Sequence, residues 1–237
     1  MSDVIRWFVL PEVIAAVTGV TLVALLRSGR RGGPDGDTRL ERTAGALLVA
    51  GFAVFMPGVA FAVSSQTGTD YIPPTFSTRA GAVLLLATLS LTLMGLLVFD
   101  AILWRRGDRS LSTVGTAAYL AAVIAWAAAT ERALVVHEWT YRLEAAFIVA
   151  TGISMLAFGS AVIRTGAIAR WLGWVAIGWS IGWLIRFAMP HQGYPPMIAQ
   201  LVPLVFGFAL LRVAARDRSS QRRQNAMGRT VVRGRVG

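Results

Sequence analysis

The chain has 237 residues, of which 55% are hydrophobic and only 15% are charged, whereas soluble domains carry about 25% charged residues. Its apolar residues gather in long runs, and each run approaches the roughly 20 residues that a helix needs to cross a bilayer. Seven such runs leave too few residues for a fused catalytic or nucleic-acid-binding domain. The absence of cysteine excludes disulfides, iron–sulfur clusters and thiolate metal sites.

These runs predict an all-α integral membrane protein, a bundle of seven transmembrane helices. In chain order the predicted spans are Trp7 to Leu26, Thr43 to Ser64, Ala80 to Trp104, Thr113 to Thr130, Tyr141 to Ile163, Arg170 to Met189 and Pro195 to Val213. Residues 1–213 then form one transmembrane domain. Residues 214–237 are polar and rich in arginine, so we predict a disordered basic tail, because this composition cannot bury enough apolar surface to fold.

The basic residues predict the orientation of the bundle. All 23 are arginine, and 18 of them lie in the tail, in alternate connections between the predicted spans or at the span ends beside these. Because short arginine-rich loops stay in the cytoplasm, we expect the N-terminus outside and the C-terminus in the cytoplasm of a bacterial cell, in the cytoplasmic membrane. The tail either adheres to anionic lipid headgroups or serves only as a topology anchor. We expect no nucleic-acid partner, and without lysine the chain cannot hold retinal as a Schiff base.

Small residues at four-residue spacing predict where helices approach closely. One stripe runs through Ala117, Ala121, Ala125 and Ala129, and a second pair is Gly178 and Gly182. Contact inside the bundle is the commoner use of such stripes, and a homodimer face is the alternative.

Ionisable side chains are costly in lipid and are therefore candidates for function. With the predicted orientation, nine of them gather at the outer end of the bundle: Glu12, Glu131, Arg132, His137, Glu138, Arg142, Glu144, Arg186 and His191. They form either a balanced structural network or an outward-facing polar pocket. In a pocket, Arg186 would offer a fork for a carboxylate or phosphate. We expect the pocket to bind a small molecule or a lipid without enzymatic chemistry, as in a sensor, a carrier component or an accessory subunit.

Two further functions remain as alternatives. His137 and His191 with Glu131 or Glu12 would complete a two-histidine, one-glutamate zinc site, as in an intramembrane metal-dependent hydrolase. No HExxH-type pair places two ligands on one helical turn, so no metal or other cofactor is predicted. A small-solute transporter is the second alternative, although the prolines show no matching broken helices in two halves.

The stretch "IRTGAIARWLGW" at 163–174, with "LVPLVFGFALLR" at 201–212, resembles the carboxyl half of a family of uncharacterised bacterial multi-pass membrane proteins. That family has an arginine–tryptophan–leucine start to a helix at this place, and here Ala169 stands where the family has a proline. The stretch "ERTAGALLVAGFAVFMPGVAF" at 41–61 is also similar, so the resemblance covers about half of the chain. It implies a multi-pass helical fold and supplies no catalytic residue.

Overall fold

The computed structural model describes residues 34–64, 79–135, 141–188 and 200–233. The helices in these ranges are α3 (Pro34–Ser64), α4 (Arg79–Arg105), α5 (Leu111–Val135), α6 (Tyr141–Thr165), α7 (Arg170–Ala188) and α8 (Leu201–Arg233). The predicted all-α class is confirmed for this part of the chain. The first predicted span, Trp7 to Leu26, lies outside the described residues.

Four of the described helices are long and apolar enough to cross a membrane. These candidate spans are Val83–Arg105, Leu111–Arg132, Tyr141–Thr165 and Arg170–Ala188. They correspond to four consecutive predicted spans. The prediction of helices long and apolar enough to span a membrane is thus confirmed for α4 to α7, while α3 and α8 are not among the candidates found in the described residues.

Two helices differ from their predicted bounds. α3 begins nine residues before the predicted span, because Pro34 and the acidic residues that follow it favour a helix start. α8 continues to Arg233, so the residues from 214 to 233, predicted to be disordered, are helical. Alanine, arginine and glutamine are good helix formers, and an anchored helix extends without a new nucleation step. The apolar composition from which the spans were predicted does not indicate this continuation of α8.

Two turns at the same end of the bundle rest on glycines with positive φ. Gly107 (φ 99°) follows α4, and Gly166 (φ 63°) follows α6. After α4 the N–H of Asp108 donates to the carbonyl of Leu103 at 3.0 Å, which is the hydrogen bond of a Schellman cap. We call this end of the bundle the turn end, and the opposite end the far end.

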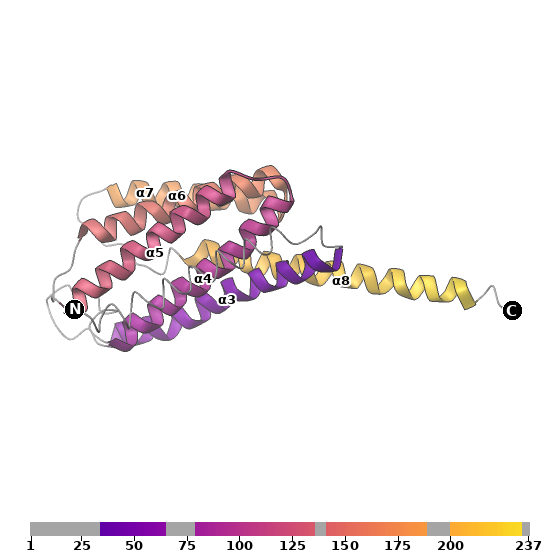
Figure 1. Cartoon of the computed structure of the whole chain (residues 1–237), viewed down its shortest axis with the longest axis horizontal. Coiled ribbons are helices and arrows are strands. Elements are labelled where there is room, and N and C mark those ends of the chain that lie inside the picture. The colour runs from indigo at the N-terminus through magenta and orange to yellow at the C-terminus, as the bar shows by residue number, and fades with distance from the viewer. Residues whose placement is uncertain (1–33, 65–78, 136–140, 189–199, 234–237) are drawn as a thin grey trace.

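The six described helices form two groups of three. α3 packs along both α4 and α8, and α6 packs along both α5 and α7. Figure 1 shows α5, α6 and α7 on one side of the bundle and α3, α4 and α8 on the other, with α8 extending past the turn end. We call α3, α4 and α8 the first unit and α5, α6 and α7 the second unit. The units meet mainly where α4 packs on α5.

Within each unit, helices approach backbone to backbone at glycines. A Cβ atom added to Gly45 of α3 would lie 2.8 Å from the carbonyl oxygen of Gly207 in α8. In the second unit, a Cβ added to Gly159 of α6 would lie 2.8 Å from the carbonyl oxygen of Gly173 in α7. Close van der Waals contact of this kind holds helices together in lipid, where there is little hydrophobic drive between them.

The small-residue stripes predicted for helix contact lie largely on open faces. Ala129 is buried, but Ala117 and Ala121 are exposed. A Cβ added to Gly178 or Gly182 would meet no described atom within 4 Å. The prediction of close contact at these two glycines is therefore wrong for the described part of the bundle. Spacing identifies a face that permits close approach, and it does not determine whether a neighbour lies there.

Contacts across the boundary between the units are fewer and include a buried polar chain. Thr92 of α4 donates through Oγ1 to Oε1 of Gln200, which directly precedes α8, at 3.0 Å. Gln200 Nε2 donates in turn to the hydroxyl of Tyr119 in α5 at 3.2 Å, and all three residues are buried. Seven residues further along α4, the ring of Phe99 stacks on Phe158 in α6, with 5.8 Å between centroids.

Candidate functional site

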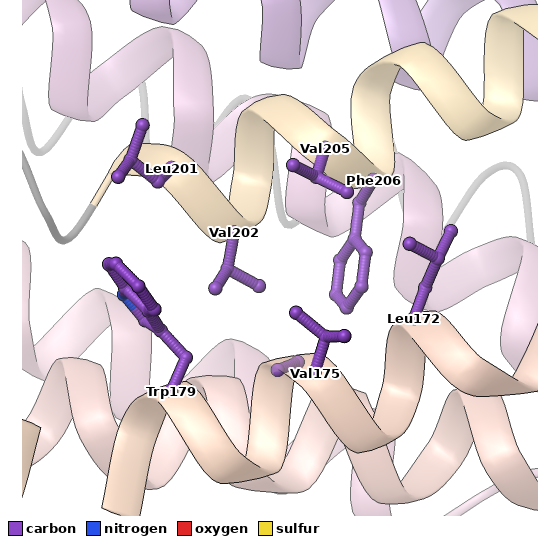
Figure 2. Close-up of a pocket in the computed structure, with 8 residues that line it drawn as sticks. Leu172, Val175, Trp179, Leu201, Val202, Val205 and Phe206 are labelled. Atoms are coloured by element: carbon purple, nitrogen blue, oxygen red, sulfur yellow. The ribbon is translucent and has the colours of Figure 1, made fainter. Parts of the chain in front are cut away.

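An apolar groove lies between α7 and α8, at the boundary between the units. Its volume is about 230 Å³, and its lining residues are Leu172, Val175, Ala176, Trp179, Leu201, Val202, Val205 and Phe206. Figure 2 shows Trp179 of α7 and Val202 and Phe206 of α8 pointing into the space between the two helices. Apart from the indole N–H of Trp179, the lining carries no side-chain group that forms hydrogen bonds. The lining can therefore bind a ligand through dispersion contacts.

The groove follows from the glycine contacts within the units. The close approach at Gly159 and Gly173 draws α7 onto α6, and the one at Gly45 and Gly207 draws α8 onto α3. Each helix is therefore held towards its own unit, and α7 and α8 touch at few places. The space between them is filled only in part by their side chains.

The rim of the groove is accessible from outside the bundle. Val175 is 47% exposed and Trp179 is 38% exposed on α7, and Val205 is 40% exposed on α8. Large exposed apolar surface of this kind marks a membrane-facing or ligand-binding surface. A hydrocarbon chain could enter this groove sideways, without passing a polar entrance.

The structure places five of the nine predicted outer residues at the far end of the second unit. Glu131 and Arg132 lie near the end of α5, Arg142 and Glu144 at the start of α6, and Arg186 near the end of α7. Because neighbouring helices of this unit run antiparallel, these ends come together. Arg132, Arg142 and Arg186 are exposed, and the two glutamates are half-buried. The other four, Glu12, His137, Glu138 and His191, lie outside the described residues.

Arg186 has an aromatic neighbour. Its guanidinium carbon lies 5.7 Å from the centroid of the Trp183 ring, within the range of a cation–π contact. The Trp183 ring lies in turn 6.1 Å from that of Trp179, which lines the groove. A series of aromatic contacts therefore connects the predicted far-end cluster with the groove.

The turn end carries an ion-pair cluster that the sequence reasoning did not single out. Arg106, just after α4, donates through Nη2 to Oε1 of Glu41 in α3 at 2.6 Å and through Nη1 to the carbonyl of Ala167 at 3.1 Å. Ala167 belongs to the α6–α7 turn of the second unit. Arg106 therefore connects both units. Arg105 pairs with Asp37 at 3.0 Å beside this contact.

Glu41 is buried, with 1% of its side chain exposed. Burial raises the pKa of Glu41 above its ordinary value of 4.5, and the nearby Arg106 lowers it in part. The carboxylates of Asp217 in α8 and Asp37 raise this pKa further. The second carboxylate oxygen, Oε2, has no hydrogen-bond partner among the described residues.

Asp108 completes the turn end and connects α5 with α6. Its Oδ2 accepts a hydrogen bond from the N–H of Ser112 at 2.7 Å, which satisfies a free donor of the first turn of α5. Its Oδ1 lies 3.9 Å from Nη1 of Arg164 near the end of α6. These contacts have structural roles, because they hold the turns of the bundle in place.

Within the described ranges, no group of three or more histidine, cysteine, aspartate or glutamate residues is placed to hold a metal ion. The hydrolase alternative rests on His137 and His191, which lie outside those ranges, and it stays a hypothesis. Comparison of the chain with family models, with curated proteins and with solved structures finds no match. The family resemblance drawn from the RWLGW segment therefore also stays a prediction.

No feature of the sequence indicates the groove. Its lining residues are ordinary apolar residues of two predicted spans, and only the lateral positions of α7 and α8 create the space. Glu41 could have been found as an acid close to the start of a predicted span, although its partner Arg106 is 65 residues away.

Proposed function

We propose that the chain is a seven-span protein of a bacterial cytoplasmic membrane that binds the hydrocarbon chain of a lipid in the groove between α7 and α8. The observation that carries this proposal is the groove itself, with its apolar lining and open rim. Its volume of about 230 Å³ is below the roughly 300–1,000 Å³ of pockets for compact drug-sized ligands. Part of one extended hydrocarbon chain suits it better.

The chemistry of the lining supports a lipid over a polar solute. A polar molecule entering this groove would lose its hydrogen bonds to water and gain few in return. A hydrocarbon chain has no such loss, and it fills space whose lining atoms otherwise lack contact partners. The protein thus acts as a lipid-binding sensor, carrier component or accessory subunit.

The proposed topology puts the turn end in the cytoplasm and the far end outside. It is supported by the arginines at the two turns, among them Arg105, Arg106 and Arg164, because basic loops remain in the cytoplasm. In this orientation the arginine-rich part of α8 reaches anionic headgroups of the inner leaflet. A reporter fused after Gly237 should therefore be cytoplasmic, and an external position of this reporter would reverse the orientation.

The lipid proposal is tested by photolabelling in nanodiscs. A phosphatidylcholine with a diazirine on one acyl chain is incorporated, and labelled peptides are identified by mass spectrometry. We expect label concentrated at residues 172–179 and 201–206. Val205→Trp should fill the groove and reduce this label several-fold.

Ile153→Trp is the matched control, because Ile153 on α6 is 43% exposed, close to the 40% of Val205, and does not line the groove. This variant should label the groove as the wild type does. Label spread evenly over the groove and over the exposed apolar face of α6 would contradict the proposal, since ordinary boundary lipid would then account for it.

A further inference from the structure

The face of α7 that lines the groove continues to Arg186. Leu172, Val175 and Trp179 lie three and four residues apart, and the same spacing leads through Trp183 to Arg186. Residues at this spacing lie on one side of a helix. Arg186 therefore lies on the groove side of α7, nearer than Trp179 to the far end of the bundle. Because a helix rises about 1.5 Å per residue, the two residues are about 10 Å apart along the helix axis.

Arg186 is a cation available to a ligand. It is exposed, and within the described residues its guanidinium forms no ion pair with a carboxylate. Its described neighbour is the ring of Trp183, which leaves the donors at the edge of the guanidinium plane free to bind an anion. The candidate span of α7 ends at Ala188, so Arg186 lies at the depth of lipid headgroups.

We propose that the groove and Arg186 form one site for an anionic phospholipid, whose acyl chain fills the groove while its phosphate binds the Arg186 guanidinium. This inference rests on the proposed lipid-binding function and adds the class of lipid. An arginine fork binds phosphate oxygens with two parallel hydrogen bonds. In a zwitterionic lipid the headgroup ammonium competes for the same phosphate, so charge complementarity favours a lipid with net negative charge.

Trp183 couples the two parts of the site. Its ring contacts Trp179 at 6.1 Å and the Arg186 guanidinium at 5.7 Å. Indole rings favour the interface between headgroups and hydrocarbon. Trp183 thus lies where the glycerol region of a bound lipid would pass, and its contact with Arg186 holds the cation on the groove side of α7.

The test compares two photoreactive lipids with identical acyl chains, phosphatidylglycerol and phosphatidylcholine, in nanodiscs that contain the full chain. The readout is the ratio of groove labelling by the two lipids at residues 172–179 and 201–206. The wild type should favour phosphatidylglycerol. Arg186→Gln should lower this ratio about fivefold, the effect expected for one basic residue at a membrane surface, while phosphatidylcholine still labels the groove.

Two variants control for charge and position. Arg142→Gln removes another exposed arginine at the far end, on α6, and should leave the ratio unchanged. Arg186→Lys keeps the charge without the fork and should retain part of the preference. An unchanged ratio in Arg186→Gln, or an equal fall in Arg142→Gln, would overturn the assignment of the headgroup to Arg186. No groove labelling by either lipid would instead overturn the proposed function itself.

Disulfide cross-linking would reveal other occupants of the groove. Because the chain has no cysteine of its own, introduced cysteines can pair only with one another. Quantitative disulfide formation between Gly19→Cys and Val205→Cys would show that the predicted first span fills the groove. Disulfide-linked dimers of Val205→Cys alone would show that a second copy fills it. Either result would overturn the lipid site, and we expect neither.

Discussion

The contacts within the two units differ in kind from those between them. Within the units, helices meet backbone to backbone, as at Gly45 with Gly207 and at Gly159 with Gly173. Between the units, the contacts include the hydrogen-bonded chain through Gln200 and the Arg106 contact with the α6–α7 turn, and the boundary opens into the α7–α8 groove. Each unit is thus held by close backbone packing, whereas at the boundary polar contacts lie beside a groove that side chains fill only in part.

The largest effect should come from breaking a contact within a unit. Gly159→Leu would push a side chain into the backbone of α7, where even a Cβ would lie 2.8 Å from the Gly173 carbonyl oxygen. We expect a loss of more than about 3 kcal/mol in the free energy of unfolding, the upper end for overpacking. Unfolding in sodium dodecyl sulfate titrations would measure it.

Gly178→Leu is the matched control on the next helix, because an added Cβ there would meet no described atom within 4 Å. Its effect should stay within about 0.5 kcal/mol, as for surface substitutions. Equal losses in the two variants would show that the open face of α7 is covered in the folded protein.

Arg106 makes one polar contact within the first unit, with Glu41, and one between the units, with Ala167. Arg106→Met would leave the buried carboxylate of Glu41 unpaired. Loss of one member of a buried pair costs about 3–5 kcal/mol, and we expect about 2–3 kcal/mol here because solvent screens the side chain of Arg106, which is one-third exposed. The measurement is again the free energy of unfolding in detergent.

The double variant Glu41→Met with Arg106→Met separates the ion pair with Glu41 from the hydrogen bond to Ala167. Removing both charges should recover the loss within the first unit. The remaining deficit then measures the hydrogen bond to Ala167 across the boundary, at about 1 kcal/mol. A double variant as unstable as Arg106→Met alone would mean that Arg106 acts mainly between the units.

Gln200→Leu should have a smaller effect, because hydrogen bonds between membrane helices contribute about 0.6 kcal/mol on average. Gln200 joins Thr92 and Tyr119, so we expect a loss of about 1 kcal/mol in the same unfolding titration. A loss as large as that of Gly159→Leu would show that polar contacts hold the boundary as firmly as the glycine contacts hold each unit.

The smallest effect concerns pH. The raised pKa of Glu41 means that the folded chain holds this proton more tightly than the unfolded chain. The contribution of Glu41 to stability is therefore most favourable below its ordinary pKa of 4.5 and declines as pH rises through the raised pKa. Comparison with Glu41→Gln isolates the contribution of this carboxyl group from the pH dependence of the rest of the protein.

As the pH rises above 4.5, the melting temperature of the wild type in detergent should fall relative to that of Glu41→Gln. The two melting temperatures would run parallel with pH if Arg106 fully compensated the burial of Glu41. This outcome would show that the contact within the first unit is electrostatically balanced.

The positions of the helices in the chain were largely predictable, and their lateral neighbours were not. Long apolar runs indicated α4 to α7 within a few residues, because the length of a membrane-spanning helix is set by the bilayer. The continuation of α8 to Arg233 was missed, because the prediction weighed apolar burial and not helix propensity. The far-end position of Arg186 on α7 followed from helix order, but its contact with Trp183 required the side-chain arrangement.

The sequence by itself determined the all-helical class, the apolar lengths of α4 to α7 and the ends of those helices at which charged residues lie. These are properties of single segments, and hydrophobicity and spacing encode them locally. Only the tertiary structure decided that Gly159 and Gly173 make contact while Gly178 and Gly182 meet none of the described residues, that Arg106 reaches Glu41, and that α7 and α8 leave a groove. These properties depend on which helix lies beside which, and in a chain whose helices are apolar on most sides, many neighbours satisfy the same pattern.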